Sequence, residues 1–369
     1  MKKTYVFLAA AIAGLLLFAG INLKTKTPYG FAKGTPEVKS ITALTFGPNG
    51  VLFIGDSQSA AVYAVDTKDA ANGTAKAYDI QGIDAKIAAV LGTTKETITI
   101  TDMAVNPVSK KLYIAVRSAD GTPVLLTLDN SNAIKAVSLK DVDFSVVALN
   151  DAPPALADAA DRGATQKRVS SISDMAYADG KLMLSGLSNK EFSSSFRTIA
   201  FPFTGKAGDI ASLEMYHASH GRFETTSPIR TFSTTNIDGK NYMVASYTCT
   251  PLVLYPMDEL KSGAHVKGRT IAEMGNGNTP SDMIWLKSDK NYLVMANSAR
   301  PAVKVSYDDI KSFQGTLTER IPGTGGTNFV KLPYEKVTQL DKLDDGRAVV
   351  IQRKANGDLD LWTSDGKNI

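Results

Sequence analysis

The sequence has little cysteine and little histidine. Among its 369 residues there is one cysteine, Cys249, and there are three histidines. A single cysteine excludes an internal disulfide framework. Basic and acidic residues nearly balance, with a formal net charge of +4 and no block of one sign. Nucleic-acid-binding proteins usually concentrate basic charge on one face, so we expect no nucleic-acid partner. The composition, 43% hydrophobic and 21% charged, is that of a globular protein and excludes a polytopic membrane protein.

The first 26 residues form a separate segment. Met1-Lys2-Lys3 precedes an apolar run from Tyr5 to Ile21, and Lys24 and Lys26 follow it. A basic start and a hydrophobic stretch are typical of an export signal, and the run is just long enough for an N-terminal membrane anchor. No cysteine follows that would make a bacterial lipoprotein. We therefore expect residues 1–26 to be an export signal or a single-span anchor, and the rest of the chain to be periplasmic or extracellular.

One strand pattern recurs six times in the remainder of the chain. A second strand follows the first after 10 to 13 residues, as in VLFIGDS from Val51, and turn residues such as Gly47-Pro48-Asn49-Gly50 join the two. A third strand and, in most copies, a weaker polar fourth strand come next, as in AKAYDIQ. Each unit is predicted to be a four-stranded antiparallel meander. The first strands start 51 to 72 residues apart, at Ile41, Ile100, Ile172, Ile229, Pro280 and Val337.

Six such sheets bury their faces by stacking around an axis. The sequence therefore predicts an all-β, six-bladed β-propeller over residues 27–369, with a two-sheet sandwich as the alternative. The sixth copy stops after its third strand, at the end of the chain. We expect an N-terminal strand from residues 29–38 to complete that blade and close the ring, and we expect a monomer.

The repeated units resemble a known class of propellers. VLFIGDSQSAAVYAVD and YLVMANSARPAVKVSYDD are similar to units of the six-bladed regucalcin- and gluconolactonase-like and NHL-repeat propellers. For the regucalcin-like lactonases the resemblance implies a divalent-metal site with a glutamate at the start of the first inner strand. Here that start reads Ile41-Thr42-Ala43, and the asparagine ligands have no counterpart at matching positions. The resemblance therefore supports the fold and not the lactonase activity.

Inner strands start, and second strands end, on one face of a propeller. We therefore expect a set of polar residues to border one mouth of the central channel and bind a ligand. The aspartates among them have two interpretations: they accept backbone N–H bonds that lock a blade to its neighbour, or they bind a cation such as calcium or a polar ligand. The arginines could neutralise them or bind an anionic ligand. The expected ligand-binding residues are Asp102, Asp174 and Asp282 on inner strands, and Asp56, Arg117, Tyr247, Asn297 and Arg353 on second strands.

The scarce histidines and the cysteine converge on the same face. His217 and His220 lie in YHASHGRFETTSPI, a blade-to-blade connection, and Cys249 lies in SYTCTP at the end of a second strand. Imidazoles and a thiolate are suitable ligands for copper or zinc, so the sequence predicts a metal site. A cysteine nucleophile activated by a histidine, or ordinary loop residues beside a buried thiol, remain alternatives.

Three functions follow from these features. The first is an exported propeller that binds a small molecule or a protein at its mouth. The second is a metal-dependent enzyme at the same mouth, which is either a hydrolase of lactonase-like type or a redox enzyme. The third is a scaffold within a cell-envelope complex. The insertion at residues 145–168 is expected to be a loop with a short helix that partly covers the mouth. No haem, P-loop or dinucleotide motif is present.

Overall fold

The computed structural model describes residues 27–155, 167–365 and 368. The predicted export signal or anchor at residues 1–26 lies outside the described residues, as do residues 156–166 of the insertion. No helix in the described part of the chain is long and apolar enough to cross a membrane.

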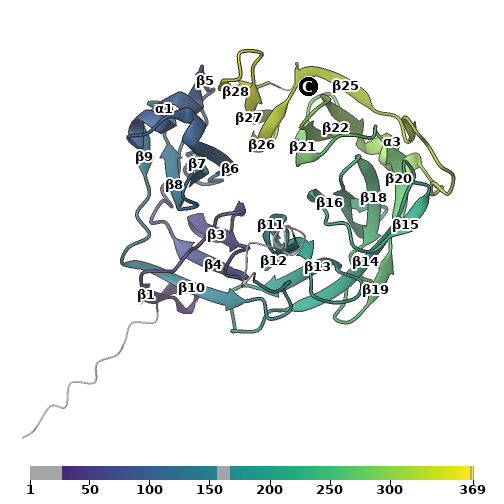
Figure 1. The fold of residues 1–369 in the computed structure, drawn as a ribbon, viewed down its shortest axis with the longest axis horizontal. Coiled ribbons are helices and arrows are strands. Elements are labelled where there is room, and N and C mark those ends of the chain that lie inside the picture. Colours follow the sequence, from purple (N-terminus) through teal and green to yellow (C-terminus); the bar gives the residue numbers. More distant parts are fainter. Residues whose placement is uncertain (1–26, 156–166, 366–367, 369) are drawn as a thin grey trace, which may run out of the picture.

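Six sheets surround a central channel, which confirms the predicted all-β six-bladed β-propeller (Figure 1). Their strands pair antiparallel except β19, which pairs parallel with β14. We number the blades in the order in which the chain forms their inner strands. Blade 1 contains β2 (Ala43–Phe46), β3 (Val51–Asp56), β4 (Ala61–Asp66), β10 (Val142–Ala148) and β1 (Ala32–Gly34). Blade 2 contains β6 (Ile98–Val105), β7 (Leu112–Ser118), β8 (Pro123–Leu128) and β9 (Ile134–Ala136). Blade 3 contains β11 (Asp174–Ala178), β12 (Lys181–Leu187), β13 (Ser194–Ala200), β14 (Asp209–His217) and β15 (Arg222–Glu224), with β19 (His265–Lys267) beside β14.

The second half of the chain forms the other three blades. Blade 4 contains β16 (Thr231–Ile237), β17 (Lys240–Ser246), β18 (Pro251–Pro256), β20 (Arg269–Glu273) and β24 (Gly325–Gly326). Blade 5 contains β21 (Pro280–Lys287), β22 (Asn291–Asn297), β23 (Pro301–Ser306) and β25 (Val330–Glu335). Blade 6 contains β26 (Val337–Asp344), β27 (Arg347–Arg353), β28 (Leu359–Ser364) and β5 (Asp79–Ile80). Short helices connect some strands: α1 (Ile83–Val90), α3 (Tyr307–Ser312), η1 (Pro28–Gly30), η2 (Pro48–Gly50) and η3 (Lys95–Thr97).

The blades do not follow one another around the ring in chain order. The inner strand of blade 1, β2, contacts both β6 of blade 2 and β11 of blade 3, whereas β6 contacts β26 of blade 6. Blade 1 therefore lies between blades 2 and 3 (Figure 1). After completing blade 2, the chain returns along the outside of blade 1 as β10, which pairs antiparallel with β4. The first part of the predicted loop at residues 145–168 is thus an outer strand.

A strand from the N-terminal part of the chain closes the ring, but it is not the predicted segment. Residues 29–38 do not reach blade 6: β1 pairs with β10 on the outside of blade 1. Blade 6 is completed by β5, in which Ile80 pairs with Leu361. The reason is apolar burial, because Ile80 and the α1 residues Ile83 and Ile87 pack in one core cluster with Leu361. The sequence pattern had predicted β5 as the edge of blade 1.

Hydrophobic clusters fill the spaces between neighbouring blades. Met103 of blade 2 packs with Val349 of blade 6, and Met283 of blade 5 packs with Val244 of blade 4. Such contacts bury apolar surface on both faces of every blade, which a single sheet cannot do. The blades therefore hold the loops at the channel mouth on a rigid frame.

Candidate functional site

The three predicted aspartates link neighbouring blades. The carboxylate of Asp102 accepts a hydrogen bond from the backbone N–H of Leu44 at 2.5 Å. Asp174 accepts one from Phe232 at 2.8 Å, and Asp282 accepts one from Leu340 at 2.7 Å. In each pair the donor belongs to the inner strand of the adjacent blade. The structure therefore gives these carboxylates the blade-to-blade contacts of the first interpretation.

A fourth aspartate, which the sequence pattern did not predict, joins them in the channel. Asp341 accepts hydrogen bonds from the backbone N–H groups of Val105, at 2.6 Å, and Lys342, at 2.7 Å. Counted from the start of the inner strand, Gln339 is the residue equivalent to Asp174, but β26 has a register irregularity between Val337 and Gln339. The channel aspartate therefore lies two residues further along the strand.

Burial shifts the ionisation of the channel carboxylates. It raises the pKa of Asp174 to about 7, with the nearby charge of Asp341 adding to the effect and hydrogen bonds opposing it. Burial likewise raises the pKa of Asp341 to about 6. The pKa values of Asp102 and Asp282 are also raised, by burial and by the neighbouring carboxylates. Four close carboxylates in a narrow channel favour the protonated forms.

Three of the predicted second-strand residues do not face the mouth. Asp56 is fully buried and accepts hydrogen bonds from the backbone N–H groups of Lys39 and Ser40. Tyr247 is buried with its hydroxyl 2.7 Å from that of Tyr255. Asn297 is buried and accepts a hydrogen bond from the side-chain amide of Asn278. These three residues fix loops and are not available to a ligand.

The strand register explains why the equivalent positions diverge. Gly55 pairs with the inner-strand residue Ala43, and Ala115 pairs with Asp102. Asp56 therefore lies one residue beyond the paired position, whereas Arg117 lies two residues beyond it. A difference of one residue turns a side chain to the opposite face of a strand. Arg117 is accordingly exposed.

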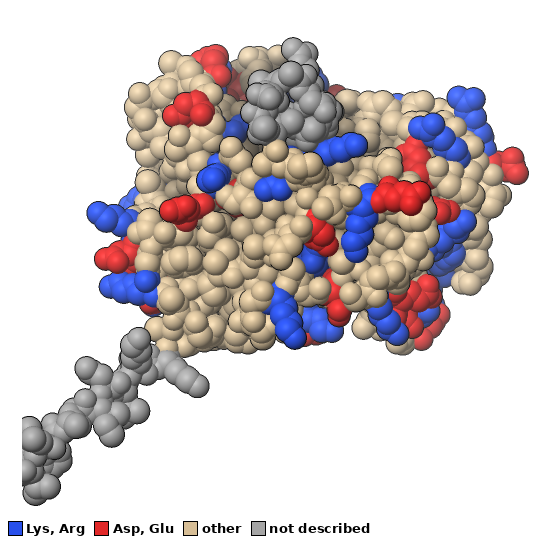
Figure 2. All heavy atoms as spheres, turned by 60° about the horizontal axis from the view of Figure 1, so that its bottom comes forward, with Lys and Arg blue, Asp and Glu red and all other residues tan. Residues whose placement is uncertain are grey.

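The channel mouth is a cavity of about 950 Å³ with a strongly basic wall. Its described lining residues include five cationic side chains and no carboxylate, and many of the others carry hydroxyls. On the outer surface seen in Figure 2, by contrast, basic and acidic side chains are interspersed. The five cationic residues, which we call the basic mouth cluster, are Arg117, Arg168, Arg230, Lys336 and Arg353.

The described structure gives the basic mouth cluster no ion pairs. Arg168 donates to the backbone carbonyls of Gln58 and Pro153, and Arg353 donates to that of Gly357. No described carboxylate forms a salt bridge with any of the five residues. Arg230 is half-buried, and this burial lowers the pKa of its guanidinium. A buried cation without a compensating anion is costly, so this mouth is suited to a negatively charged ligand.

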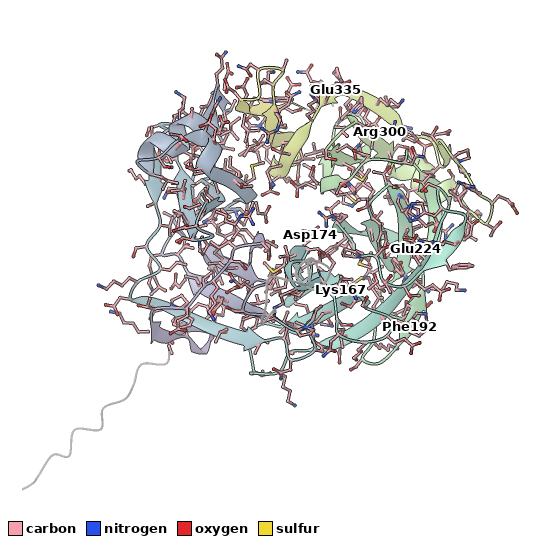
Figure 3. The ribbon with its side chains drawn as sticks, viewed as in Figure 1. Lys167, Asp174, Phe192, Glu224, Arg300 and Glu335 are labelled. Atoms are coloured by element: carbon pink, nitrogen blue, oxygen red, sulfur yellow. The ribbon has the colours of Figure 1, made fainter. Side chains whose placement is uncertain are left out.

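The predicted metal ligands come together at a different place. His217 ends β14, His220 lies in the turn that follows, and Cys249 lies between β17 and β18. One ligand atom from each of the three lies within 4.8 Å of the others, and Cys249 Sγ is 3.9 Å from His220 Nε2. None of the three lines the mouth cavity. In Figure 3, Glu224 of this group lies far out on the ring, whereas Asp174 lies beside the channel.

Glu224 organises the histidine pair, although the sequence pattern did not single it out. Its carboxylate is 3.0 Å from His217 Nδ1 and 2.6 Å from His220 Nδ1, and it accepts a hydrogen bond from Ser227 Oγ at 2.7 Å. Burial alone would raise its pKa, but the hydrogen bonds from His217, Ser227 and His220 outweigh it and hold the pKa below its usual range. The signal was available, because Glu224 follows His220 by four residues in the same connection.

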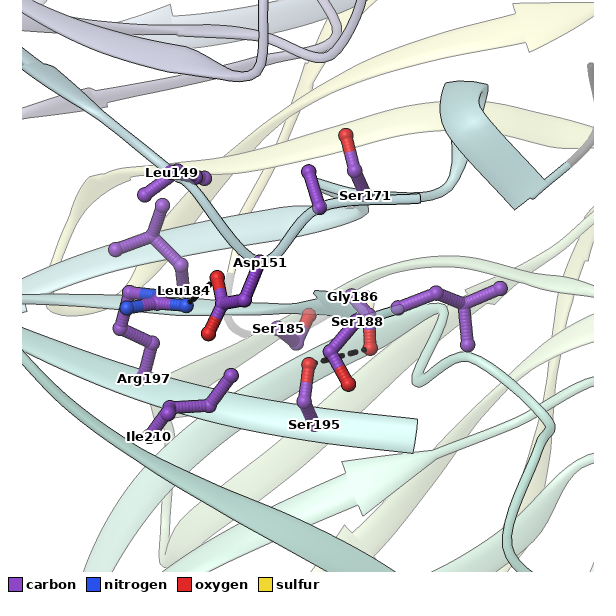
Figure 4. Close-up of a pocket in the computed structure, with 12 residues that line it drawn as sticks. Leu149, Asp151, Ser171, Leu184, Ser185, Gly186, Ser188, Ser195, Arg197 and Ile210 are labelled. Carbon is purple, nitrogen blue, oxygen red and sulfur yellow. Dashed lines mark hydrogen bonds and ion pairs between the residues drawn. The ribbon is translucent and has the colours of Figure 1, made fainter. Parts of the chain in front are cut away.

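A small cavity between blades 1 and 3 is not a ligand site (Figure 4). Its volume is about 10 Å³, which is room for one water molecule at most. Arg197 is buried there and pairs with Asp151, and Ser195 donates a hydrogen bond to the carbonyl of Gly186. The Arg197–Asp151 pair joins the blade-1 outer connection to blade 3, and the Ser195–Gly186 bond lies within blade 3.

Fold and site together define a six-bladed propeller with a basic channel mouth and a separate peripheral His–Cys cluster. No family model matches the chain, and no curated protein matches it. Among solved structures, an aldose sugar dehydrogenase from Streptomyces coelicolor in its PQQ-bound form is 10% identical, with 91% of this chain and 99% of that chain covered and a TM-score of 0.37.

Two further structures are similar to the same degree. A putative glucose dehydrogenase from Thermus thermophilus is 11% identical, with 91% of this chain and all of that chain covered (100%) and a TM-score of 0.37. The Cps50 (Swd1) β-propeller domain from Myceliophteria thermophila is 9% identical, with 87% and 82% covered and a TM-score of 0.36. At these values the similarities carry no argument about function, which has to come from the site.

Proposed function

We propose that this protein is an exported binding protein that holds a small anionic ligand in the channel mouth. The observation that carries the proposal is the basic mouth cluster: five cations around a cavity of about 950 Å³ with no described carboxylate among its lining residues. Guanidinium groups bind carboxylate or phosphate through paired, charge-assisted hydrogen bonds. The surrounding hydroxyls supply additional donors and acceptors for a polar ligand.

Export rests on the sequence of residues 1–26 alone. We infer from it that the propeller lies in the periplasm or outside the cell, either released or held by the N-terminal segment. Fractionation of cells that produce the full chain tests this part of the proposal. Recovery of the protein in the cytoplasm would contradict it, and the binding proposal would stand independently.

Calorimetric titration with small anions tests the binding proposal. The panel contains inorganic phosphate, a tricarboxylate such as citrate, a sugar phosphate and the matching neutral sugar. We expect one saturable site for an anion, no binding of the neutral sugar, and affinity that falls as salt rises. The double variant Arg117→Gln/Arg353→Gln should weaken binding at least tenfold.

A matched control removes two charges on the opposite face. Lys181 is the first residue of β12 in blade 3, and Lys290 lies in the turn between β21 and β22 in blade 5. Lys181→Gln/Lys290→Gln therefore changes net charge equally without touching the mouth. An equal loss in both double variants would mean that net charge, and not the mouth, attracts the anion. That result would overturn the proposal.

A further inference from the structure

The peripheral cluster contains two imidazoles that share one carboxylate. His217 and His220 both direct Nδ1 at Glu224, and their ring centroids are 3.8 Å apart. This leaves the Nε2 atoms of both rings to face away from Glu224. Metal-bound histidines in proteins characteristically have their other ring nitrogen bonded to a carboxylate, which fixes ring orientation and tautomer. Glu224 supplies that arrangement twice, and Ser227 and Arg222 hold its carboxylate in turn.

The Nε2 atom of His217 is the most informative atom of the cluster. The side chain of His217 is 2% exposed, and Nε2 is buried without a hydrogen-bond partner. Leaving a buried polar nitrogen without a hydrogen-bond partner is energetically costly. Buried polar atoms without partners are few in native proteins and call for an explanation, such as an ion. Here the other two candidate ligands lie within 4.8 Å of His217.

The loop that carries the thiol is held in an uncommon backbone conformation. Cys249 has φ +68° and Thr250 has φ +57°, both in the left-handed region that side chains other than glycine rarely adopt. The turn is fixed by the Cys249 N–H, which donates to the Asn278 carbonyl, and by Thr250 Oγ1, which donates to the Gly275 carbonyl. Backbone strain of this kind concentrates at functional sites. The turn places Cys249 Sγ 3.9 Å from His220 Nε2.

We propose that His217, His220 and Cys249 bind one zinc or copper ion, through the imidazole nitrogens and the thiolate, with Glu224 as the residue that positions both histidines. Thiolate and imidazole select these borderline and soft metals, whereas calcium and magnesium prefer oxygen ligands. At typical metal–ligand distances of about 2.0–2.1 Å to nitrogen and about 2.3 Å to sulfur, the three ligand atoms, which now lie within 4.8 Å of one another, have to move closer together on binding. Three protein ligands leave a position for water or another ligand.

Metal titration of the full chain, stripped with a chelator, tests the site. Cobalt(II) serves as the spectroscopic probe, because a thiolate ligand gives it a charge-transfer absorption that imidazole and carboxylate do not. We expect one equivalent to bind, the band to appear, and zinc(II) to displace it. Cys249→Ser should abolish the band, and His217→Ala should weaken binding at least tenfold. Competition between zinc(II) and copper(I) chelators then identifies the preferred ion.

Two further variants separate coordination from other effects. Glu224→Gln should keep the thiolate–cobalt band but lower metal affinity about 10- to 100-fold, as expected of a residue that acts through the ligands. His265→Ala is the matched control, because His265 lies in β19, where it contacts Ser212 and Glu214 of β14 and is not part of the cluster. Circular dichroism verifies the fold of each variant. Absence of stoichiometric binding, a band that persists in Cys249→Ser, or an equal loss in His265→Ala would overturn the proposal.

Discussion

Asp102 accepts a hydrogen bond from the backbone N–H of Leu44, a residue 58 positions earlier in the chain. The bonds of Asp174 and Asp282 run forward in the chain instead, with donors at Phe232 and Leu340, and the bond from Val105 to Asp341 joins blade 2 to blade 6. The reversal places blade 1 after blade 2 around the ring. With this order, the chain leaves blade 2 and passes along the outside of blade 1 as β10 before it forms blade 3. The connection between blades 1 and 2 contributes β5 to blade 6.

The first prediction concerns β5, the strand that completes blade 6 and closes the ring. Ile80 is buried where β5 pairs with β28, so Ile80→Ala should lower the free energy of unfolding by about 2–5 kcal/mol. Urea denaturation of the purified protein measures the loss. Ile134→Ala provides the matched control, because Ile134 lies half-buried in the outer strand β9 and should lose clearly less. Equal losses in the two variants would contradict a special role of β5 in closing the ring.

The repeats made the number of blades predictable, because turn residues and apolar runs recur at regular spacing. They could not reveal the order of the blades. AKAYDIQ follows the third strand of blade 1 in the sequence, but the pairing and burial of Ile80 against Leu361 show that it belongs to blade 6. Likewise Val146 is predicted to lie in a loop insertion, although it pairs with Tyr63 in blade 1. Such choices depend on contacts between residues far apart in the chain, which local patterns do not record.

The second prediction concerns pH. The pKa of Asp174 is about 7 in the folded protein, against about 3.9 for an unfolded aspartate, so the folded state binds more protons between these values. The stabilising contribution of this group is therefore present at low pH and is lost as pH rises through about 7. Between pH 5 and pH 8, the free energy of unfolding should therefore fall less in Asp174→Asn than in the unaltered protein, by on the order of 1–3 kcal/mol.

Urea midpoints at the two pH values measure that decline. The exposed Asp289 offers a matched control, since Asp289→Asn makes the same change in a turn outside the channel. We expect its pH dependence to match that of the unaltered protein. A pH profile of Asp174→Asn as steep as that of the parent would mean that other groups cause the decline.

The candidate site was predictable in part. Spacing alone placed Arg117 and Arg353 at the mouth and brought His217, His220 and Cys249 to one location. It failed where a one-residue register difference decides which way a side chain points, as for Asp56. It also failed for Arg230, whose importance comes from burial without a described carboxylate partner, a property that depends on the arrangement of several blades around the mouth.

The last prediction uses this property of Arg230. In the absence of ligand its half-buried charge is uncompensated, so Arg230→Met should raise the free energy of unfolding, on the order of 1 kcal/mol, while it weakens anion binding.

Arg197 is the contrasting case, because it is buried but paired with Asp151. Arg197→Met should destabilise the protein by about 3–5 kcal/mol, since it leaves a partly buried carboxylate without its partner. Urea denaturation without ligand, followed by calorimetric titration with the tightest-binding anion, measures both effects. Opposite signs at the two arginines would mark Arg230 as a residue kept for binding. Destabilisation by Arg230→Met with unchanged anion affinity would instead make it a structural residue of the channel wall.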